Sequence, residues 1–196
     1  MDYRIYHAIN DFVARYDWLG TGLADFEKWI VPVLAALVVG LWLLARPGGS
    51  PKWKLASVAA LAAAGLALLL NQGIAQLWDR ARPFAAHPDA HVWGSRSHDP
   101  SFPSDHSSAA FAIAFAVLLF DRVAGAWFLA LAAVIGVGRV AIGDHYPSDV
   151  LAGVGVGLVA ALVVGRLALP ILRRLVALVQ RVTDPVLARF WAAWAR

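Results

Sequence analysis

Polar residues that can do chemistry lie in four places along this sequence, each at the edge of a long apolar run. Arg82 stands in an Arg-Pro pair, and a Pro-Ser-Asp-His segment ends at His106. Arg139 lies near the end of a later apolar run, and His145 and Asp149 follow it, four residues apart. Ionisable groups are costly to place at a membrane boundary, so this pattern indicates a functional site there.

The arginines and the serine of this set are suited to binding phosphate. Arginine presents a fixed fork of donors that matches phosphate oxygens, so Arg82 and Arg139 can surround a phosphoryl group from two different elements. They would also neutralise the charge that develops during its transfer. Ser104 is placed to cap a helix, whose free N–H groups and dipole would face an anion.

The histidines and the aspartate supply the reacting groups. Their spacing suggests that the Asp149 carboxylate orients the His145 imidazole and stabilises the cation formed when the other ring nitrogen attacks phosphorus. His106 is then free to protonate the leaving oxygen. The combination predicts phosphoryl transfer.

Each member of the set also has a purely structural interpretation. Ser104 can be a helix cap alone, and His106 an interfacial histidine. An arginine at the edge of a span needs a partner, which for Arg139 is Asp144 or Asp149. Histidines and acids of the loop before Ser104 have irregular spacing, so a solvated loop is favoured over a metal site. They are His87, Asp89, His91, His98 and Asp99.

The composition predicts one all-α integral membrane domain over residues 1–196. Hydrophobic residues make up 60% of the chain and charged residues 15%, and the mean hydropathy is +0.64. The 17 basic and 13 acidic residues leave an excess too small to suggest nucleic-acid binding. The chain has no cysteine, which excludes disulfides and thiolate metal ligands.

Apolar stretches predict a helical bundle of five membrane spans, with six as the alternative count. They cover residues 29–45, 55–78, 105–120, 125–142 and 149–170. The residues before and after them alternate apolar with polar positions, which predicts amphipathic helices on the membrane surface over about 1–20 and 171–196. The acids before Lys28 do not suit a cleavable signal peptide. Glycines in the last two spans predict close helix packing, at Gly136, Gly138, Gly153, Gly155 and Gly157.

Basic residues predict the orientation of the spans. The 46–54 link holds three basic residues and no acid, and the tail after residue 170 holds five arginines. Short cytoplasmic loops are enriched in Lys and Arg, so both segments are expected inside. The long loop 79–104 and the connection 143–148 then lie outside, and every candidate site residue converges there.

In three places these residues resemble the signature motifs of the type 2 phosphatidic acid phosphatase superfamily. The matching segments are Arg82-Pro83, Pro103-Ser104-x-His106 and Arg139-x5-His145-x3-Asp149. The resemblance is close over residues 79–149, and the order of spans agrees with it over most of the chain. It implies a helical membrane phosphatase that needs no metal or other cofactor.

The resemblance also implies a role for each site residue. His145 would be the nucleophile that forms a phosphohistidine, Asp149 its orienting partner, and His106 the acid. The phosphate would be cradled by Arg82, Ser104 and Arg139.

The sequence departs from the family at two positions. The first motif usually begins with a lysine where Ala75 stands, so one phosphate contact is missing unless Arg80 replaces it. Glycine is usual where Asp105 lies, and its carboxylate would have to turn away and leave the backbone N–H facing the phosphate. An aspartate there is typical of the bacitracin-resistance branch of bacterial undecaprenyl pyrophosphate phosphatases, which the segment 101–106 resembles.

The resulting expectation is an enzyme that converts undecaprenyl pyrophosphate to undecaprenyl phosphate, on the outer side of a bacterial inner membrane, to recycle a cell-wall carrier lipid. Its partners would be the polyprenyl diphosphate and the bilayer, and a homodimer is compatible with the sequence. The alternatives are a broader phosphatase of phosphatidic acid, phosphatidylglycerophosphate or lipid A, and a noncatalytic phospholipid-binding or transport protein.

Overall fold

The structure is a computed structural model that describes residues 1–94 and 96–194. These residues form helices and connecting segments without a β-strand, which confirms the predicted all-α class. In chain order the helices are α1 (Asp2–Ala14), α2 (Asp17–Leu44), α3 (Lys52–Leu77), α4 (Pro83–Ala86), α5 (Asp105–Leu118), α6 (Arg122–Ala141), α7 (Pro147–Leu162), the π-helical η1 (Val163–Leu167) and α8 (Leu169–Trp194).

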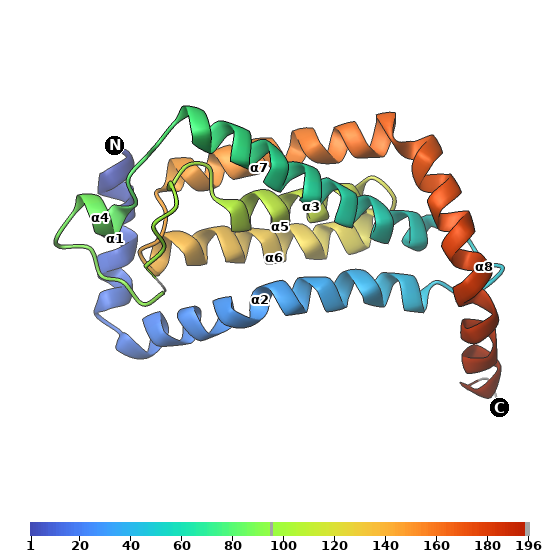
Figure 1. Ribbon diagram of the computed structural model, residues 1–196. Helices are drawn as coiled ribbons and strands as arrows, with labels where there is room; N and C mark the ends of the chain where they lie inside the picture. The colour runs from blue at the N-terminus through green and yellow to red at the C-terminus, as the bar shows by residue number, and fades with distance from the viewer. Residues whose placement is uncertain (95, 195–196) are drawn as a thin grey trace.

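Helices α2, α3, α5, α6 and α7 run side by side as a bundle, with α5 in contact with α3, α6 and α7 (Figure 1). Small side chains allow these helices to approach α5 closely. Buried alanines lie along it at Ala110, Ala112, Ala114 and Ala116. The predicted order of five bundle helices is therefore confirmed.

Four of the five are long and apolar enough to cross a membrane: α2, α3, α6 and α7 continued through η1. The protein is thus a multi-pass membrane protein. Helix α5 has only 14 residues, and at about 1.5 Å per residue it spans about 21 Å, less than the ~30 Å of a bilayer core. Figure 1 shows it beginning deeper in the bundle than the neighbouring ends of α6 and α7. The loop before α5 must therefore descend into the bundle.

The first bundle helix begins at Asp17, twelve residues before the predicted span at 29–45, and the predicted surface helix over 1–20 ends at Ala14. Charged residues in 17–28 made this stretch look unlike a span. Lys28 pairs with Asp25 at 2.7 Å on the exposed surface, and Glu27 pairs with Arg139 of α6. Because these charges are solvated or paired, the helix continues through them.

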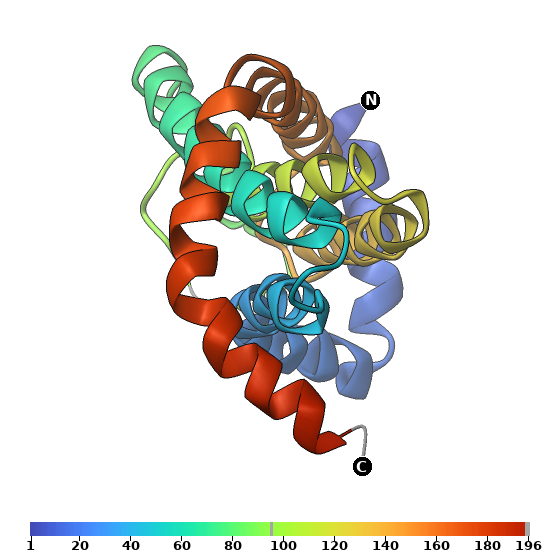
Figure 2. The same ribbon diagram turned by 90° about the vertical axis from the view of Figure 1, so that its right-hand side faces the viewer.

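The terminal helices α1 and α8 cross opposite ends of the bundle (Figures 1 and 2). Helix α1 exposes Ile5 and Phe12 and buries Asn10, whose side chain donates to the carbonyls of His91 and Ala141. Helix α8 is held to α3 by an ion pair between Asp184 and Lys54. The Lys54 side chain is completely buried. Both terminal helices are amphipathic, as predicted, and each is attached to the bundle by polar contacts.

Two of the predicted packing glycines bring α7 against α5. A Cβ at Gly153 would lie 2.8 Å from the Ser107 Cβ, and one at Gly157 would lie 2.7 Å from the Ala112 nitrogen. Gly155, on the same helix, has nothing within 4 Å of such an atom, so the packing interpretation is wrong there. The packing interpretation is wrong for Gly138 for the same reason. It holds for Gly136, where a Cβ would lie 2.8 Å from Val150 Cγ1.

Candidate active site

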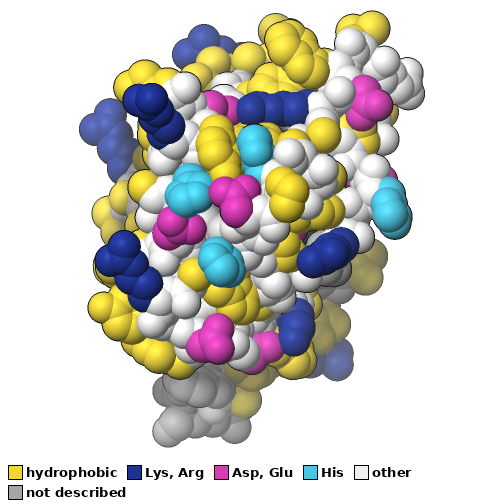
Figure 3. Space-filling model, turned by 90° about the vertical axis from the view of Figure 1, so that its left-hand side faces the viewer, with side chains coloured by type: hydrophobic (Ala, Val, Ile, Leu, Met, Phe, Trp, Pro, Cys, Tyr) yellow, Lys and Arg dark blue, Asp and Glu magenta, His cyan; other side chains and the backbone are white. Residues whose placement is uncertain are grey.

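The end of the bundle beneath α1 holds a cavity of about 700 Å³ between α2, α3, the loop 78–104, α5 and α6. Histidine, acidic and basic side chains gather on this end of the molecule (Figure 3). Five of the predicted site residues border the cavity: Arg82, Asp105, His106, Arg139 and His145. The described residues that border it do not include Arg80, Ser104 or Asp149.

The His145 ring lies in the short connection between α6 and α7 and is 2% exposed. Its Nδ1 is 2.8 Å from the main-chain carbonyl of Ser101, so the proton is on Nδ1 and is donated to that oxygen. Nε2 is 3.4 Å from Nη1 of Arg82 and accepts from it. This tautomer directs the lone pair of Nε2 toward a guanidinium that borders the cavity, as a nucleophile for an anionic phosphoryl group requires.

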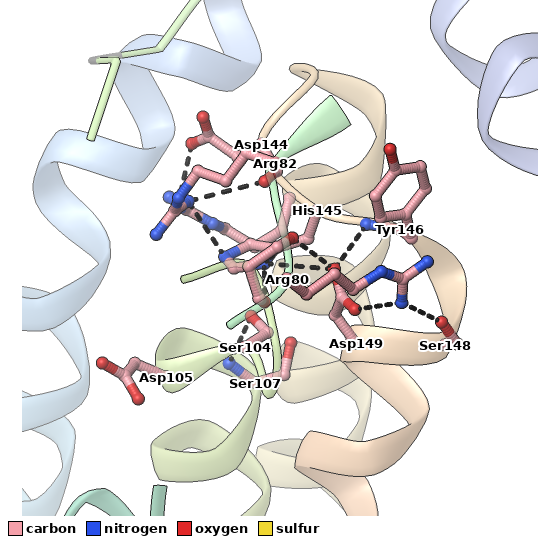
Figure 4. A network of polar contacts seen from close by, with 12 residues as sticks. Arg80, Arg82, Ser104, Asp105, Ser107, Asp144, His145, Tyr146, Ser148 and Asp149 are labelled. Atoms are coloured by element: carbon pink, nitrogen blue, oxygen red, sulfur yellow. Dashed lines mark hydrogen bonds and ion pairs between the residues drawn. The ribbon is translucent and has the colours of Figure 1, made fainter. Parts of the chain in front are cut away.

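The Asp149 carboxylate is fully buried in the first turn of α7, close to the imidazole but not bonded to it directly. Asp149 Oδ2 lies 3.6 Å from His145 Nδ1, while it accepts from the hydroxyl of Ser101 at 2.5 Å and from the amide of Tyr146 at 2.9 Å. Ser101 therefore bridges the two residues, with its hydroxyl on the carboxylate and its carbonyl on the imidazole. Figure 4 shows His145, Tyr146 and Asp149 of this network close together.

Ser101 was not predicted as a site residue. Its one signal in the sequence is its place in the segment 101–106, three residues before Ser104. Ser104 itself is buried and caps α5, accepting from the amide of Ser107 at 3.4 Å. Its own amide donates to the carbonyl of Asp149 at 3.2 Å. Ser104 thus joins the start of α5 to the start of α7 and fixes where His106 meets the cavity.

The two predicted phosphate-binding arginines border the cavity in different electrostatic settings. Arg82 donates from Nε to the carbonyl of Asp99 at 2.9 Å and from Nη1 to that of Asp144 at 3.4 Å. Arg139 pairs with the Asp144 carboxylate at 2.9 Å and with Glu27. Of the two partners predicted for Arg139, Asp144 and Asp149, the structure shows Asp144. Glu27 also borders the cavity, and sequence spacing gave no indication that α2 would reach the site.

Residues 56–171 match the sequence model of a family described as the PAP2 superfamily. The chain belongs to this superfamily. The resemblance inferred from the motifs is confirmed, because the match spans all three of them.

Known PAP2 proteins match the chain over most of its length. It is 33% identical to the "Bacitracin transport permease protein BcrC" of Bacillus licheniformis, over 80% of this chain and 75% of that protein. It is 27% identical to the "Undecaprenyl-diphosphatase BcrC" of Bacillus subtilis strain 168, over 95% of this chain and 94% of that protein. The crystal structure of Aquifex aeolicus LpxE has the same fold, with a TM-score of 0.68 at 24% identity, covering 83% of this chain and 93% of that one. The protein is a membrane lipid phosphatase of the PAP2 superfamily.

Arg80, expected to replace the family lysine missing at Ala75, lies apart from Ala75. Ala75 borders the cavity, whereas Arg80 is not among the described residues that border it and binds Asp149. Its Nη1 is 2.6 Å from Asp149 Oδ1 and 2.7 Å from the Ser148 hydroxyl, and its guanidinium stacks 4.0 Å from the centre of the Tyr146 ring. Arg80 thus meets a buried carboxylate in this structure, and its expected contact with phosphate stays a prediction.

Asp105 borders the cavity, but its carboxylate is directed to one side of it. Its Oδ1 accepts from the Asn71 side chain of α3 at 2.7 Å, and Asn71 also bonds the hydroxyl of Ser108. Figure 4 shows Asp105 apart from the network around His145. The amide of Asn71 thus holds the carboxylate, and its orientation relative to a bound phosphate stays a prediction.

The electrostatic surroundings of His145 keep the imidazole neutral. Burial lowers its pKa below the ordinary 6.5, and the positive charges of Arg139 and Arg82 lower it further. The Asp149 carboxylate acts in the opposite direction and only partly offsets them. A neutral imidazole has the free electron pair that attack on phosphorus would need, which suits the nucleophilic role predicted for His145.

Proposed function

We propose that this phosphatase hydrolyses undecaprenyl pyrophosphate to undecaprenyl phosphate and phosphate through a phosphohistidine on His145. The observation that carries the proposal is the tautomer of His145. Its Nδ1 is occupied by the Ser101 carbonyl, and its Nε2 faces Arg82 at the cavity. Simple anion binding would not require a buried neutral imidazole held in this way.

In the first step, His145 Nε2 attacks the terminal phosphorus, and the bond from that phosphorus to the bridging oxygen breaks. His106, half-buried at the same cavity, donates a proton to the leaving undecaprenyl phosphate. The imidazole becomes a cation, which the nearby Asp149 carboxylate stabilises. In the second step, water attacks the phosphohistidine, His106 takes back a proton, and phosphate leaves with the imidazole restored.

Arg82 and Arg139 would hold the equatorial phosphoryl oxygens during both steps. Both are buried and fixed by hydrogen bonds or ion pairs, so little side-chain entropy is lost when phosphate binds. The free N–H groups at the start of α5 add a positive dipole end near His106. No metal enters this mechanism.

The diphosphate substrate is supported by the printed name of the Bacillus subtilis relative, an undecaprenyl-diphosphatase that matches nearly the whole chain. The membrane helices allow a long isoprenoid tail to stay in the bilayer while its headgroup reaches the cavity. We place the cavity on the outer face of a bacterial inner membrane. The arginines of α8 lie at the opposite end of the bundle, and basic residues favour the cytoplasmic side (Figure 1).

The proposal is tested by phosphate release from purified protein in detergent with EDTA, using undecaprenyl pyrophosphate and phosphatidic acid. We expect a strong preference for the diphosphate. His145→Ala should lower turnover by about a thousandfold or more, because the nucleophile is lost. His98→Ala is the matched control, since this loop histidine is exposed and is not among the described residues that border the cavity. Acid quenching of the wild type should trap a phosphoenzyme that His145→Ala lacks.

Equal rates on the two lipids would replace the proposal with a broad lipid phosphatase. Full activity of His145→Ala would remove the phosphohistidine. Loss of turnover in EDTA, restored by a divalent cation, would show that the mechanism without a metal is wrong.

A further inference from the structure

Helix α1 contributes a carboxylate to the polar network behind the nucleophile. Asp2 Oδ1 accepts from the amide of Ser148 at 3.0 Å, and Asp2 Oδ2 accepts from the Ser148 hydroxyl. The same Oδ2 lies 2.6 Å from Nη2 of Arg80, whose Nη1 is 2.6 Å from Asp149. Asp2, Arg80 and Asp149 therefore form a continuous row of alternating charges from the terminal helix to the carboxylate beside His145.

Arg80, the cation in this row, has two opposed effects on the site. It pairs with the fully buried carboxylate of Asp149, and an unpaired buried charge is strongly unfavourable. Its positive charge, however, cancels the negative charge with which Asp149 stabilises an imidazolium. A second carboxylate on the far side of Arg80 restores one net negative charge to the row.

Asp2 is ionised in this position. Burial alone would raise its pKa, but the hydrogen bonds from Ser148 and Arg80 outweigh burial and hold the pKa below its usual range. The carboxylate is 29% exposed, so solvent screens it only in part. The negative charge of Asp2 therefore acts on the site by way of Arg80, which contacts both Asp2 and Asp149.

We propose that Asp2 is a positioning residue of the phosphoryl transfer: it holds Arg80 and offsets its charge, so that Asp149 can stabilise the imidazolium of the phosphohistidine. This inference rests on the proposed nucleophilic role of His145. It assigns to the amphipathic terminal helix a part in the reaction in addition to its place at the membrane surface.

The other charges around His145 make this contribution matter. Arg82 from the loop and Arg139 from α6 both oppose a cation on the ring. The carboxylates of Asp144 and Glu27 are engaged by Arg139. Among the described residues, the neighbouring titratable and charged groups include Glu27 from α2, Arg80 and Arg82 from the loop, His106 from α5, Arg139 from α6, Asp144 and Tyr146 from the connection and Asp149 from α7.

The test measures the imidazole of His145 directly. Histidine-labelled protein in detergent is titrated by NMR, and the His145→Gln spectrum identifies the resonance. Asp2→Asn keeps the size of the side chain and removes its charge. We expect it to lower the pKa of His145, because an anion that favours the cationic ring is lost. Asp17→Asn removes an equal charge from the start of α2, where no contact joins it to the row, and should leave this pKa unchanged.

Kinetics give a second measurement on whichever lipid phosphate the wild type cleaves faster. Asp2→Asn should lower kcat on the order of tenfold, leave KM nearly unchanged, and move the acid limb of kcat/KM to lower pH. Asp2→Glu, which keeps the charge, should restore most of the rate. Thermal unfolding of each variant separates these effects from loss of the fold.

An unchanged His145 pKa in folded Asp2→Asn would overturn the inference, as would a loss of kcat that Asp2→Glu does not restore. The NMR titration needs no substrate, so it decides the role of Asp2 even if undecaprenyl pyrophosphate is not cleaved. Failure of the proposed function would appear instead in the wild type, as absent diphosphate hydrolysis.

Discussion

Replacing Ser101 with alanine separates two roles that one residue has at this site. Its hydroxyl donates to Asp149 Oδ2 at 2.5 Å, while its main-chain carbonyl accepts from His145 Nδ1 at 2.8 Å. Ser101→Ala removes the hydroxyl, with its bond to Asp149 and a longer contact of 3.5 Å to His145 Nδ1, and leaves the carbonyl in place. The carboxylate keeps its bonds to Tyr146 and Arg80, and the imidazole keeps its tautomer. The variant therefore measures how much the hydroxyl contributes by holding the carboxylate.

The magnitude follows from the type of hydrogen bond. A bond to a charged group contributes about 1.5–3 kcal/mol, and the carboxylate here is fully buried. If all of this is expressed in the transition state, kcat falls by about 10-fold to about 150-fold. The expected loss is smaller than for His145→Ala, because the nucleophile and its orientation remain.

Ser107→Ala is the matched control. Ser107 is as fully buried as Ser101, but among the described residues its hydroxyl has no hydrogen-bond partner. Lipid phosphate hydrolysis by both variants is compared with the wild type in the same detergent, together with thermal unfolding. The reasoning is refuted if Ser101→Ala keeps the wild-type kcat, or if Ser107→Ala loses as much.

Three further predictions concern pH and packing. In the proposed mechanism the neutral form of His145 is the nucleophile and its pKa is lowered, so activity should fall with acidification only below pH 6.5; an acid limb above 6.5 in the kcat/KM profile would contradict this. Gly157→Ala should destabilise by about 1–3 kcal/mol through contact with the α5 backbone, whereas Gly155→Ala should be neutral or gain up to about 1 kcal/mol, as thermal unfolding will show. Asp184→Asn should cost about 3–5 kcal/mol in denaturant unfolding by leaving the buried Lys54 charge unpaired; an unchanged midpoint would argue against the ion pair.

The helices of the bundle could be predicted because hydrophobicity determines them over long stretches. The prediction failed at the start of α2, where a window of sequence shows charges but not their partners. Glu27 looks solvent-facing until α6 brings Arg139 to it. Ion pairs between helices that are distant in sequence form only in the folded protein. A hydropathy pattern does not register such pairs, so it ends a predicted helix too early where charged residues are paired in this way.

The candidate residues could be predicted by type, but their individual contacts could not. The four-residue spacing did bring His145 and Asp149 together, because the first turn of α7 follows directly on the connection that holds the imidazole. Ser101 and Arg80 lie in irregular segments, where spacing does not determine the direction of a side chain. Only the folded loop shows that Ser101 bridges the pair and that Arg80 binds its far side.

The structure also distinguishes the two arginines that the sequence treated as equivalent. Arg139 shares its charge with two carboxylates, Glu27 and Asp144, so a phosphate that binds it must compete with them. Arg82 donates to main-chain carbonyls, and within the described part of the chain no carboxylate is paired with it. Its positive charge therefore faces the cavity without a carboxylate partner, next to Nε2 of His145. In the proposed mechanism, Arg82 would therefore attract the diphosphate first, and Arg139 would make the contact that strengthens as negative charge develops on the phosphoryl oxygens.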